Sequence, residues 1–420
     1  MQSAHTLLCK QTIKYRSFAM SAVSTPAPRT RRKASPMSDS YSARIQRHFK
    51  ETYELSLIKR HIPQKYFVQN RQHILRHSYL MNKLFAKDIV NRIWPYLKDQ
   101  VICETNVGLG LITTELIKRG VENVRVYEVC PEFRKHLRTL VHFPLRMEIF
   151  ARDLYNINAL LYFDRHDKAD RAHRMLDGLP TRHWNEASSL TIIGPMPNLN
   201  FIRYLTRAIA LQDEFLLYGR PQVFALVQPE DYHCLSATPE MSLVVYRTTS
   251  ILFQLFFNYQ VLHKYCKKSF LPWRNVPVKF EQPEDENVLL MKIIPKKQLP
   301  VSTEYLPHLF YFVIDGFKRG HQKVIPTMEK WVPGIGTTLI VPPQKYKTHF
   351  ANSIDIFTEF RELRPSEILQ LFLIMLEHPD FHASPFIPMM ESHLVKDETI
   401  DSDLVESDDK LSDIILDEKS

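Results

Sequence analysis

One strand–turn–helix–strand unit between residues 100 and 129 constrains the fold more than any other feature. The stretch QVICETNVGLGLITTELIKRG starts with a short apolar strand at 101–103 and turns at 104–110. Apolar residues then recur at helical spacing until Gly120, which ends the helix. A second strand, VRVYEV, follows and carries Glu128 near its end. This β-turn-α-β order predicts an α/β fold with a mostly parallel sheet.

The turn of this unit has the composition of a nucleoside-binding loop. Gly108 and Gly110 let the backbone approach a ligand closely, and Glu128 is placed to hydrogen-bond ribose hydroxyls. A dinucleotide site expects a third glycine where Thr113 stands, so that match fails. The pattern favours an S-adenosylmethionine site. A third strand, RMEIFARDL, ends in Asp153, which we expect to face an adenine amino group.

Two further segments extend this unit on either side. Apolar residues at 80, 84, 85, 89, 93 and 97 predict an amphipathic helix over residues 79–97. The apolar run LTIIG, at 190–194, predicts a fourth strand. The loop after it, PMPN at 195–198, lies where α/β folds place their chemistry. It contains no acid, base or nucleophile, so we predict no catalytic residue there.

The charge of the chain is distributed unevenly. Residues 397–420 hold ten acids and two lysines, a net charge of −8, so the first 396 residues carry +17 of a total of +9. A body this basic is typical of a protein that binds a polyanion, with nucleic acid the default partner. The alternative is a solvated Lys/Arg surface. We expect the acidic tail, at 391–420, to be disordered in isolation.

The first acidic residue of the chain is Asp39, and the residues before it are rich in arginine and serine. Such a composition is typical of a mitochondrial transit peptide, which we expect over residues 1–40; the alternative is a basic arm that stays on the mature protein. No apolar stretch reaches the roughly 18 residues of a membrane span. The five cysteines are scattered, which argues against a zinc site or a disulfide framework.

The second half of the chain contains two basic segments with aromatic residues among them. PQVFALV predicts a strand, and SLVVYRTTSILFQLFFNYQVLHKY predicts a long helix leading into a strand. Basic side chains interleaved with aromatic rings are typical of a nucleic-acid contact, and the alternative is a solvated loop. The predicted contact residues here are Lys264, Lys267, Lys268 and Arg274, and those of FYFVIDGFKRGHQKVI are Lys318, Arg319 and Lys323.

The segment DRHDKADRAHRMLDGLP, at 164–180, is rich in charges of both signs. We expect an exposed loop or short helix there. Its two histidines and their neighbouring aspartates are metal-ligand types, but no cysteine anchors them and arginines are abundant, so we predict no metal site.

Several of these stretches resemble one family. YLMNKLFAKDIV resembles the first cofactor-loop helix of the ribosomal RNA adenine dimethyltransferases, and ETNVGLGLIT resembles their glycine loop. The resemblance covers roughly residues 70–380, and it is clearest over 79–153. It implies a cofactor site for S-adenosylmethionine, with Glu128 on the ribose and Asp153 on the adenine. The site residues that it implies are Leu80, Glu104, Asn106, Gly108, Gly110, Glu128 and Asp153.

The same resemblance gives the loop after LTIIG a meaning. The family carries an Asn-Leu-Pro-aromatic motif there, in which the Asn accepts hydrogen bonds from the target adenine and the ring stacks on the flipped base. Aligned on the prolines, Pro195 stands in place of the Asn and Asn198 in place of the ring. His77 and Ser78 likewise replace a Gln-Asn pair. The resemblance therefore implies a cofactor site, retained or vestigial, with a degenerate catalytic loop.

NVLLMKIIPKKQL and PSEILQLFLIM resemble most the mitochondrial transcription factor B branch of this family, in its initiation-factor paralogue. FKRGHQK partly matches a family element that contacts the nucleic-acid backbone. The branch implies a methyltransferase-like domain over 41–300, a helical domain over 301–390 and a location in the mitochondrial matrix or nucleoid. Its implied function is transcription initiation, with mitochondrial RNA polymerase and promoter DNA as partners. An active mitochondrial rRNA dimethyltransferase, or a ribosome-assembly factor, is the alternative.

Overall fold

The β-α-β unit lies inside a larger sheet in the computed structural model. The structure describes residues 41–67, 77–98, 100–140, 146–241, 245–273, 287–341, 350–351 and 353–395. Its strands are β1 (Tyr79–Leu80), β2 (Val101–Thr105), β3 (Asn123–Tyr127), β4 (Arg146–Phe150), β5 (Leu190–Pro195), β6 (Gln222–Val227), β7 (Phe257–Cys266), β8 (Phe270–Leu271) and β9 (Asn287–Pro295). The transit-like arm and residues 396–420 of the acidic tail lie outside the described residues.

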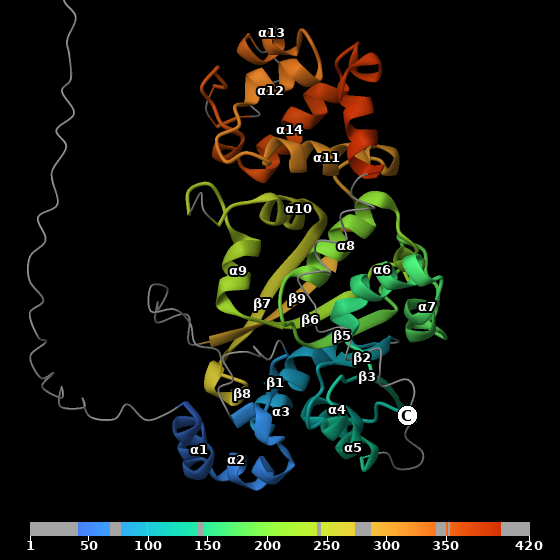
Figure 1. Ribbon diagram of the computed structural model, residues 1–420, viewed down its shortest axis with the longest axis vertical. Coiled ribbons are helices and arrows are strands. Elements are labelled where there is room, and N and C mark those ends of the chain that lie inside the picture. Colours follow the sequence, from blue (N-terminus) through green and yellow to red (C-terminus); the bar gives the residue numbers. More distant parts are fainter. Residues whose placement is uncertain are drawn as a thin grey trace, which may run out of the picture. The chain divides into compact units, whose positions relative to one another are not determined.

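Seven of these strands form one sheet in the order β4-β3-β2-β5-β6-β9-β7, and β1 pairs with β8 in a separate ribbon (Figure 1). The first five strands of the order are parallel, and β9 runs antiparallel to both of its neighbours, β6 and β7. This arrangement confirms the predicted α/β fold with a mostly parallel sheet. The strand order reverses between β2 and β5, which is where parallel α/β sheets open a crevice for ligands.

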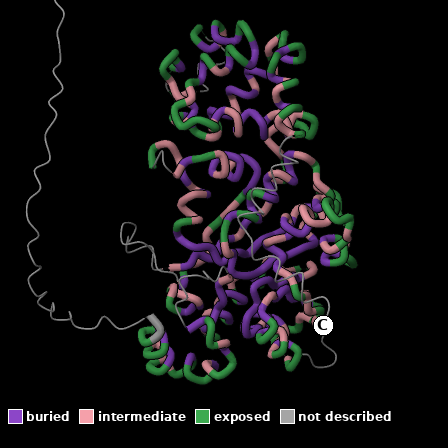
Figure 2. The backbone as a smooth tube through the Cα atoms, in the orientation of Figure 1, coloured by how far each residue is buried: buried purple, intermediate pink, exposed green. Residues whose placement is uncertain are grey.

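The described helices fall into two groups: most cover the two faces of the sheet, and the last four pack against other helices. They are α1 (Tyr41–Glu51), α2 (Tyr53–Ile58), α3 (Lys83–Ile93), α4 (Leu111–Lys118), α5 (Pro131–Arg138), α6 (Ile157–Asp167), α7 (Arg171–Leu176), α8 (Asn200–Leu211), α9 (Pro229–Ser236), α10 (Thr248–Phe256), α11 (Leu306–Gly316), α12 (Val324–Trp331), α13 (Ile335–Ile340) and α14 (Pro365–Leu376). The buried strands form the interior in Figure 2, and exposed residues lie on the outer sides of the helices.

Side-chain alternation along the strands divides the core into two halves. Ile193 of β5 and Phe224 of β6 pack with α3, α4 and α5, whereas Ile192 and Val223 pack with α6, α8 and α10. Successive strand residues point to opposite faces, so a strand covered on both sides reads as a continuous apolar run. This is why LTIIG and VFALV contain almost no polar residues.

The helices after β9 extend the second half of the core. α11 packs against α8 and α10, and α14 packs against α10 and α11 (Figure 1). Trp331 of α12 is fully buried, and its ring lies 5.1 Å from that of Phe312 in α11. Aromatic rings at this separation contribute packing energy beyond their buried area. The domain boundaries expected from the sequence remain predictions.

Three local expectations need correction. The helix expected from residue 79 begins at Lys83, because Asn82 caps it by accepting hydrogen bonds from the backbone N–H groups of Leu84 and Phe85. The charged segment at 164–180, expected as an exposed loop or short helix, does contain a short helix, α7, joined to the end of α6 by an ion pair between Arg171 and Asp164, but it is exposed only in part because α7 buries Ala172, Met175 and Leu176. The helix expected before the strand at 257–266 is short, since α10 covers only Thr248–Phe256. No helix of the described residues is long and apolar enough to cross a membrane.

Candidate nucleoside site and basic surfaces

The carboxyl ends of four neighbouring parallel strands gather the predicted cofactor residues. Glu104 lies near the end of β2, Glu128 follows β3, and Asp153 lies three residues after β4. Pro195 ends β5. All three acids are buried, although they come from separate strands. This is the edge of the sheet at which α/β folds bind ligands.

The turn after β2 has the backbone conformation of a ligand loop. Asn106, Gly108 and Gly110 have φ values of +55°, +59° and +69°. At Gly110 an added Cβ would lie 2.7 Å from a methyl carbon of Leu137. This contact and the positive φ together favour glycine at this position. The backbone N–H of Gly108 points at Glu128 and donates to its Oε2 over 2.7 Å. The turn therefore joins the glycine loop to the acid that the sequence assigned to a ribose.

The two carboxylate oxygens of Glu128 accept different numbers of hydrogen bonds. Its Oε1 accepts hydrogen bonds from the backbone N–H of Cys130 over 2.7 Å and from the hydroxyl of Tyr79 over 3.2 Å. Among the described residues, its Oε2 accepts a hydrogen bond from Gly108 alone. Because a carboxylate oxygen has two lone-pair positions, one acceptor position remains for a ligand hydroxyl.

Burial changes the protonation of both glutamates. Burial raises the pKa of Glu104 to about 8, the hydrogen bond from Thr113 opposes this change, and the nearby Glu128 adds to it. Burial also raises the pKa of Glu128, against the two backbone N–H donors. A buried carboxyl with a raised pKa carries its proton more often at neutral pH. Glu104 accepts a hydrogen bond from the Thr113 hydroxyl, and this bond connects β2 to α4 across the glycine loop.

Asp153 organises the end of β4. Its Oδ1 accepts from the Thr105 hydroxyl and from the backbone N–H of Tyr155, each over 3.0 Å. Its Oδ2 lies 3.5 Å from Nδ1 of His77. Thr105 thus ties the ends of β2 and β4 together, which fixes the position of the acid predicted to face an adenine.

The part that β1 plays in the site was not predicted from the sequence. Leu80, assigned to the cofactor, is buried and pairs with Phe270 of β8. Its neighbour Tyr79 is fully buried, with a ring carbon that would contact a Cβ at Gly108 at 3.0 Å. The Tyr79 ring therefore lies against the glycine loop while its hydroxyl binds Glu128. The only sequence feature that pointed to this role of Tyr79 was its position next to Leu80, a predicted cofactor residue.

The loop after β5 holds its own polar atoms inside the protein. The Pro195 carbonyl accepts from Nδ2 of Asn106 over 3.0 Å, and the Gly194 carbonyl accepts from the Tyr155 hydroxyl over 3.2 Å. Asn198 is exposed, and its Oδ1 accepts from the backbone N–H of Asn200 at the start of α8. The carbonyls of Gly194 and Pro195 are therefore engaged by other groups of the protein. Asn198 is used at the start of α8, so it does not replace the Asn acceptor of the family's motif.

The residues at this edge fit an S-adenosylmethionine-like nucleoside. Asn106 Oδ1 is buried and has no hydrogen-bond partner among the described residues, which is unusual for a buried polar atom and indicates a ligand contact. The glycine turn follows Asn106 in the chain, and Gly108 of this turn donates to Oε2 of Glu128, the oxygen with the open acceptor position. If bound, such a cofactor would supply an activated methyl group.

The first basic segment lies along one edge of the sheet. Lys264 is exposed on the edge strand β7, and Lys268 is exposed just after it. Lys267 Nζ is buried and has no hydrogen-bond partner among the described residues. A nucleic-acid contact requires an exposed charge, so this position of Nζ does not favour the contact that the sequence predicts for Lys267. Trp273 donates from Nε1 to the Lys268 carbonyl and packs near His48 of α1. Arg274 lies outside the described residues.

The second basic segment lies between α11 and α12. Lys318, Arg319 and Lys323 are exposed, as a nucleic-acid contact requires. They belong to the segment between the helices after β9, whereas Lys264 lies in β7 and Lys268 just after it. The predicted contacts therefore come from two separate parts of the fold.

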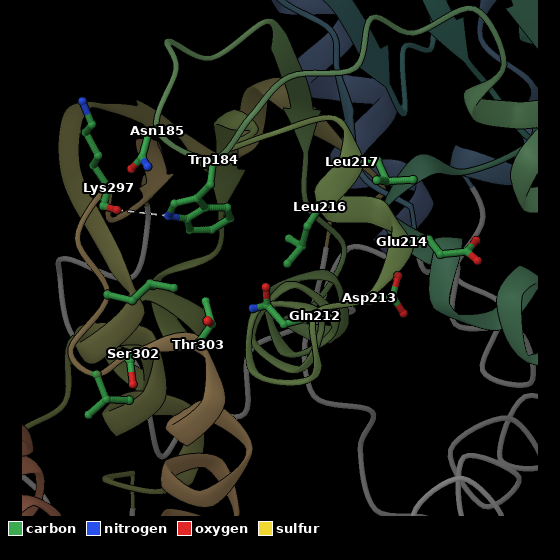
Figure 3. Close-up of a pocket in the computed structure, with 12 residues that line it drawn as sticks. Trp184, Asn185, Gln212, Asp213, Glu214, Leu216, Leu217, Lys297, Ser302 and Thr303 are labelled. Carbon is green, nitrogen blue, oxygen red and sulfur yellow. Dashed lines mark hydrogen bonds between the residues drawn. The ribbon is translucent and has the colours of Figure 1, made fainter.

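A pocket of about 600 Å³ opens elsewhere (Figure 3). Trp184 forms one wall, Leu216 and Leu217 form another, and Lys297 accepts the indole N–H of Trp184 at its carbonyl. These residues precede β5 and β6 or follow β9, so the pocket lies at the amino ends of the parallel strands. It is therefore separate from the nucleoside site. In the parts of the chain that the structure describes, no three His, Cys, Asp or Glu residues are grouped to hold a metal ion.

The fold and the site at its carboxyl edge define a protein of the class I methyltransferase type. Residues 68–341 match the model of the family described as ribosomal RNA adenine dimethylase. The chain belongs to the ribosomal RNA adenine dimethylase family, which confirms the resemblance at the level of the family.

The chain is similar to several known proteins, of which three are described here. The chain is 25% identical over 408 residues to the Drosophila melanogaster protein named dimethyladenosine transferase 2, mitochondrial, covering 85% of this chain and 90% of the relative. Among solved structures, the 23S rRNA methyltransferase ErmE is similar with a TM-score of 0.44 and 14% identity, covering 70% of this chain and 98% of that one. A dimethyladenosine transferase from Plasmodium falciparum is similar with a TM-score of 0.44 and 12% identity, covering 71% and 97%.

Proposed function

We propose that the chain is a mitochondrial transcription initiation factor that binds mitochondrial RNA polymerase and promotes melting of promoter DNA. The observation that carries the proposal is the loop after β5. A base methyltransferase of this family grips its adenine there, but Pro195 offers no side-chain acceptor and its carbonyl is bonded to Asn106. Asn198 gives no ring on which a base can stack. The scaffold is kept while the means of holding a target adenine is absent.

The two basic surfaces support a role on nucleic acid. Lys264 and Lys268 flank one edge of the sheet, and Lys318, Arg319 and Lys323 lie before α12. Lysine and arginine contacts to phosphates bind without reading sequence. A surface that binds single strands better than duplex shifts the promoter toward its open form.

Energetics argue for a second protein. Each base-pair step that opens costs about 1.4 kcal/mol of stacking free energy. One aromatic stacking contact contributes roughly 1–3 kcal/mol, so a surface with few rings holds open only a few steps by itself. The polymerase is the proposed partner that supplies the remaining strand contacts. The matrix or nucleoid of mitochondria is the proposed location, in agreement with the name of the Drosophila relative.

Run-off transcription tests this proposal. Linear duplex DNA with a mitochondrial promoter is transcribed by purified mitochondrial RNA polymerase, with and without the full-length chain. We expect run-off product only when the chain is present, with or without added S-adenosylmethionine. Equal product in its absence would refute the proposal.

An active mitochondrial rRNA adenine N6-dimethyltransferase is the second candidate. The orphaned Oδ1 of Asn106 and the open acceptor position of Glu128 favour it, because both fit a cofactor. The chain would then bind mitochondrial small-subunit rRNA. Primer extension on that rRNA after depletion of the protein separates the two candidates: loss of the adenine modification supports the enzyme, and intact modification excludes this as its sole role.

A further inference from the structure

A turn at residues 355–358 presents two large apolar side chains to solvent. Ile356 is 52% exposed and Phe357 is 66% exposed, whereas Phe360, two residues after the turn, is buried. Single exposed apolar residues are ordinary on a protein surface. Two adjacent ones at the tip of a turn, one of them aromatic, form an apolar projection that the fold does not use.

The turn is held rigidly. Asp355 Oδ1 accepts from the backbone N–H groups of Phe357 and Thr358, each over 2.8 Å, and from the Thr358 hydroxyl over 2.9 Å. The turn is fastened to the start of α12, because the Val324 N–H donates to the Thr358 carbonyl over 2.9 Å. The loss of side-chain and backbone freedom on binding is therefore small, which favours affinity.

One cation lies against the projection, and two more belong to the loop that leads to it. Lys323 Nζ lies 4.9 Å from the centre of the Phe357 ring. Among the described residues, Lys318 and Arg319 have no carboxylate within ion-pairing distance, and both are exposed on the loop that leads to Lys323.

The nearby acids are already engaged. Asp355 accepts the hydrogen bonds of its own turn, and Glu359 accepts from Arg361 over 2.6 Å and lies 3.2 Å from Nδ1 of His321. The surface thus combines an exposed aromatic ring with Lys323, which lies near Asp355, and with Lys318 and Arg319, which have no ion-pair partner among the described residues. These are the two features that proteins use to bind unpaired nucleic-acid strands.

We infer that the turn of Ile356 and Phe357 is a base-stacking site for single-stranded nucleic acid. One unpaired base stacks on Phe357, and the flanking phosphates contact Lys323 and the loop of Lys318 and Arg319. Duplex is a poor ligand, because its base faces are covered by their neighbours and only base edges and phosphates are accessible. The inference rests on the proposed function and names the residues that would hold the melted strand.

Fluorescence anisotropy with the full-length chain tests the inference without polymerase. The ligands are a labelled single-stranded oligonucleotide of mixed sequence and the duplex of the same sequence. We expect Phe357→Ala to weaken single-strand binding by roughly 5- to 100-fold, with duplex binding and the salt slope unchanged. Phe357→Trp should retain the affinity. Leu57→Ala, which truncates another exposed apolar side chain in α2, is the matched control and should behave as wild type.

Three outcomes would overturn the stacking site. One is single-strand affinity of Phe357→Ala within twofold of wild type. Another is an equal loss on single strand and duplex, which would mean a phosphate surface alone. The third is loss of polymerase capture by Phe357→Ala with strand binding intact, which would make the turn a protein contact. Failure of the proposed function is read separately, as run-off transcription that does not need the chain.

Discussion

The hydroxyl of Tyr79 donates to Oε1 of Glu128 over 3.2 Å, and both side chains are fully buried. The acid that the sequence assigns to a cofactor ribose is thus bound in part by the protein itself. A ligand hydroxyl competes with Tyr79 for one oxygen and finds a single open position on the other. If the site binds S-adenosylmethionine, we expect the affinity to depend on Tyr79, which is 49 positions away from Glu128 in the chain.

Removing that competitor should tighten S-adenosylmethionine binding. Tyr79→Phe frees a lone pair of Oε1, and a net hydrogen bond contributes about 0.5–1.5 kcal/mol, so we expect roughly three- to tenfold higher affinity by calorimetry. Tyr127→Phe removes another buried hydroxyl, bonded to the Met175 carbonyl, and should leave affinity unchanged. Glu128→Ala should weaken binding. Unchanged affinity in Glu128→Ala would contradict the assignment of this acid.

The raised pKa of Glu104 makes stability depend on pH. Its folded pKa of about 8 lies above the ordinary value of 4.5, so the folded state keeps a proton that the unfolded chain releases. The resulting stabilisation is present below pH 4.5 and is lost as the pH rises toward 8, by at most about 1.4 kcal/mol per unit. Urea unfolding at pH 6 and pH 8 should show a smaller loss for Glu104→Gln than for wild type. Glu115→Gln, in α4, is the control and should lose as much stability between pH 6 and pH 8 as wild type does. If Glu104→Gln also loses as much as wild type, burial does not hold the proton on Glu104.

Gly194 is required by the close approach of two strands. Its φ is +148°, and an added Cβ would lie 2.0 Å from the Thr105 carbonyl oxygen. Because that neighbour is backbone, Gly194→Ala should destabilise the fold by about 3 kcal/mol or more, or prevent soluble expression. Gly320→Ala is the control, since nothing lies within 4 Å of its added Cβ. Thermal unfolding measures both, and similar melting temperatures would show that the crossing tolerates a side chain.

The basic loop before α12 should appear in the salt dependence of binding. Lys318→Ala and Arg319→Ala should each weaken binding to single-stranded DNA and reduce the slope of log affinity against log salt by about one. Lys87→Ala removes an exposed lysine from α3 and should not change the slope. Slopes that stay at the wild-type value in the first two variants would remove this loop from the interface.

The sequence predicted the parts of the site that local rules govern. The glycine turn, the acid after β3 and the strand at LTIIG follow from apolar spacing and from the conformations that only glycine adopts readily. The start of α3 was misplaced because the apolar spacing continues upstream into β1, and the Asn82 cap was the overlooked signal. The bond from Tyr79 to Glu128 depends on how distant segments pack, which periodicity does not encode. The turn at Phe357 did have a local signal, an Asp three residues before a Thr, which is typical of side-chain-capped turns.

The central claim, that the chain acts by opening promoter DNA, is tested most directly by comparing two templates in run-off transcription. One is fully duplex, and the other carries a pre-melted, non-complementary segment at the start site. We expect the chain to be required on the duplex, the requirement to fall sharply on the pre-melted template, and S-adenosylmethionine to change neither result. An equal requirement on both templates would contradict strand opening as its role, and product without the chain on the duplex would contradict a role in initiation altogether.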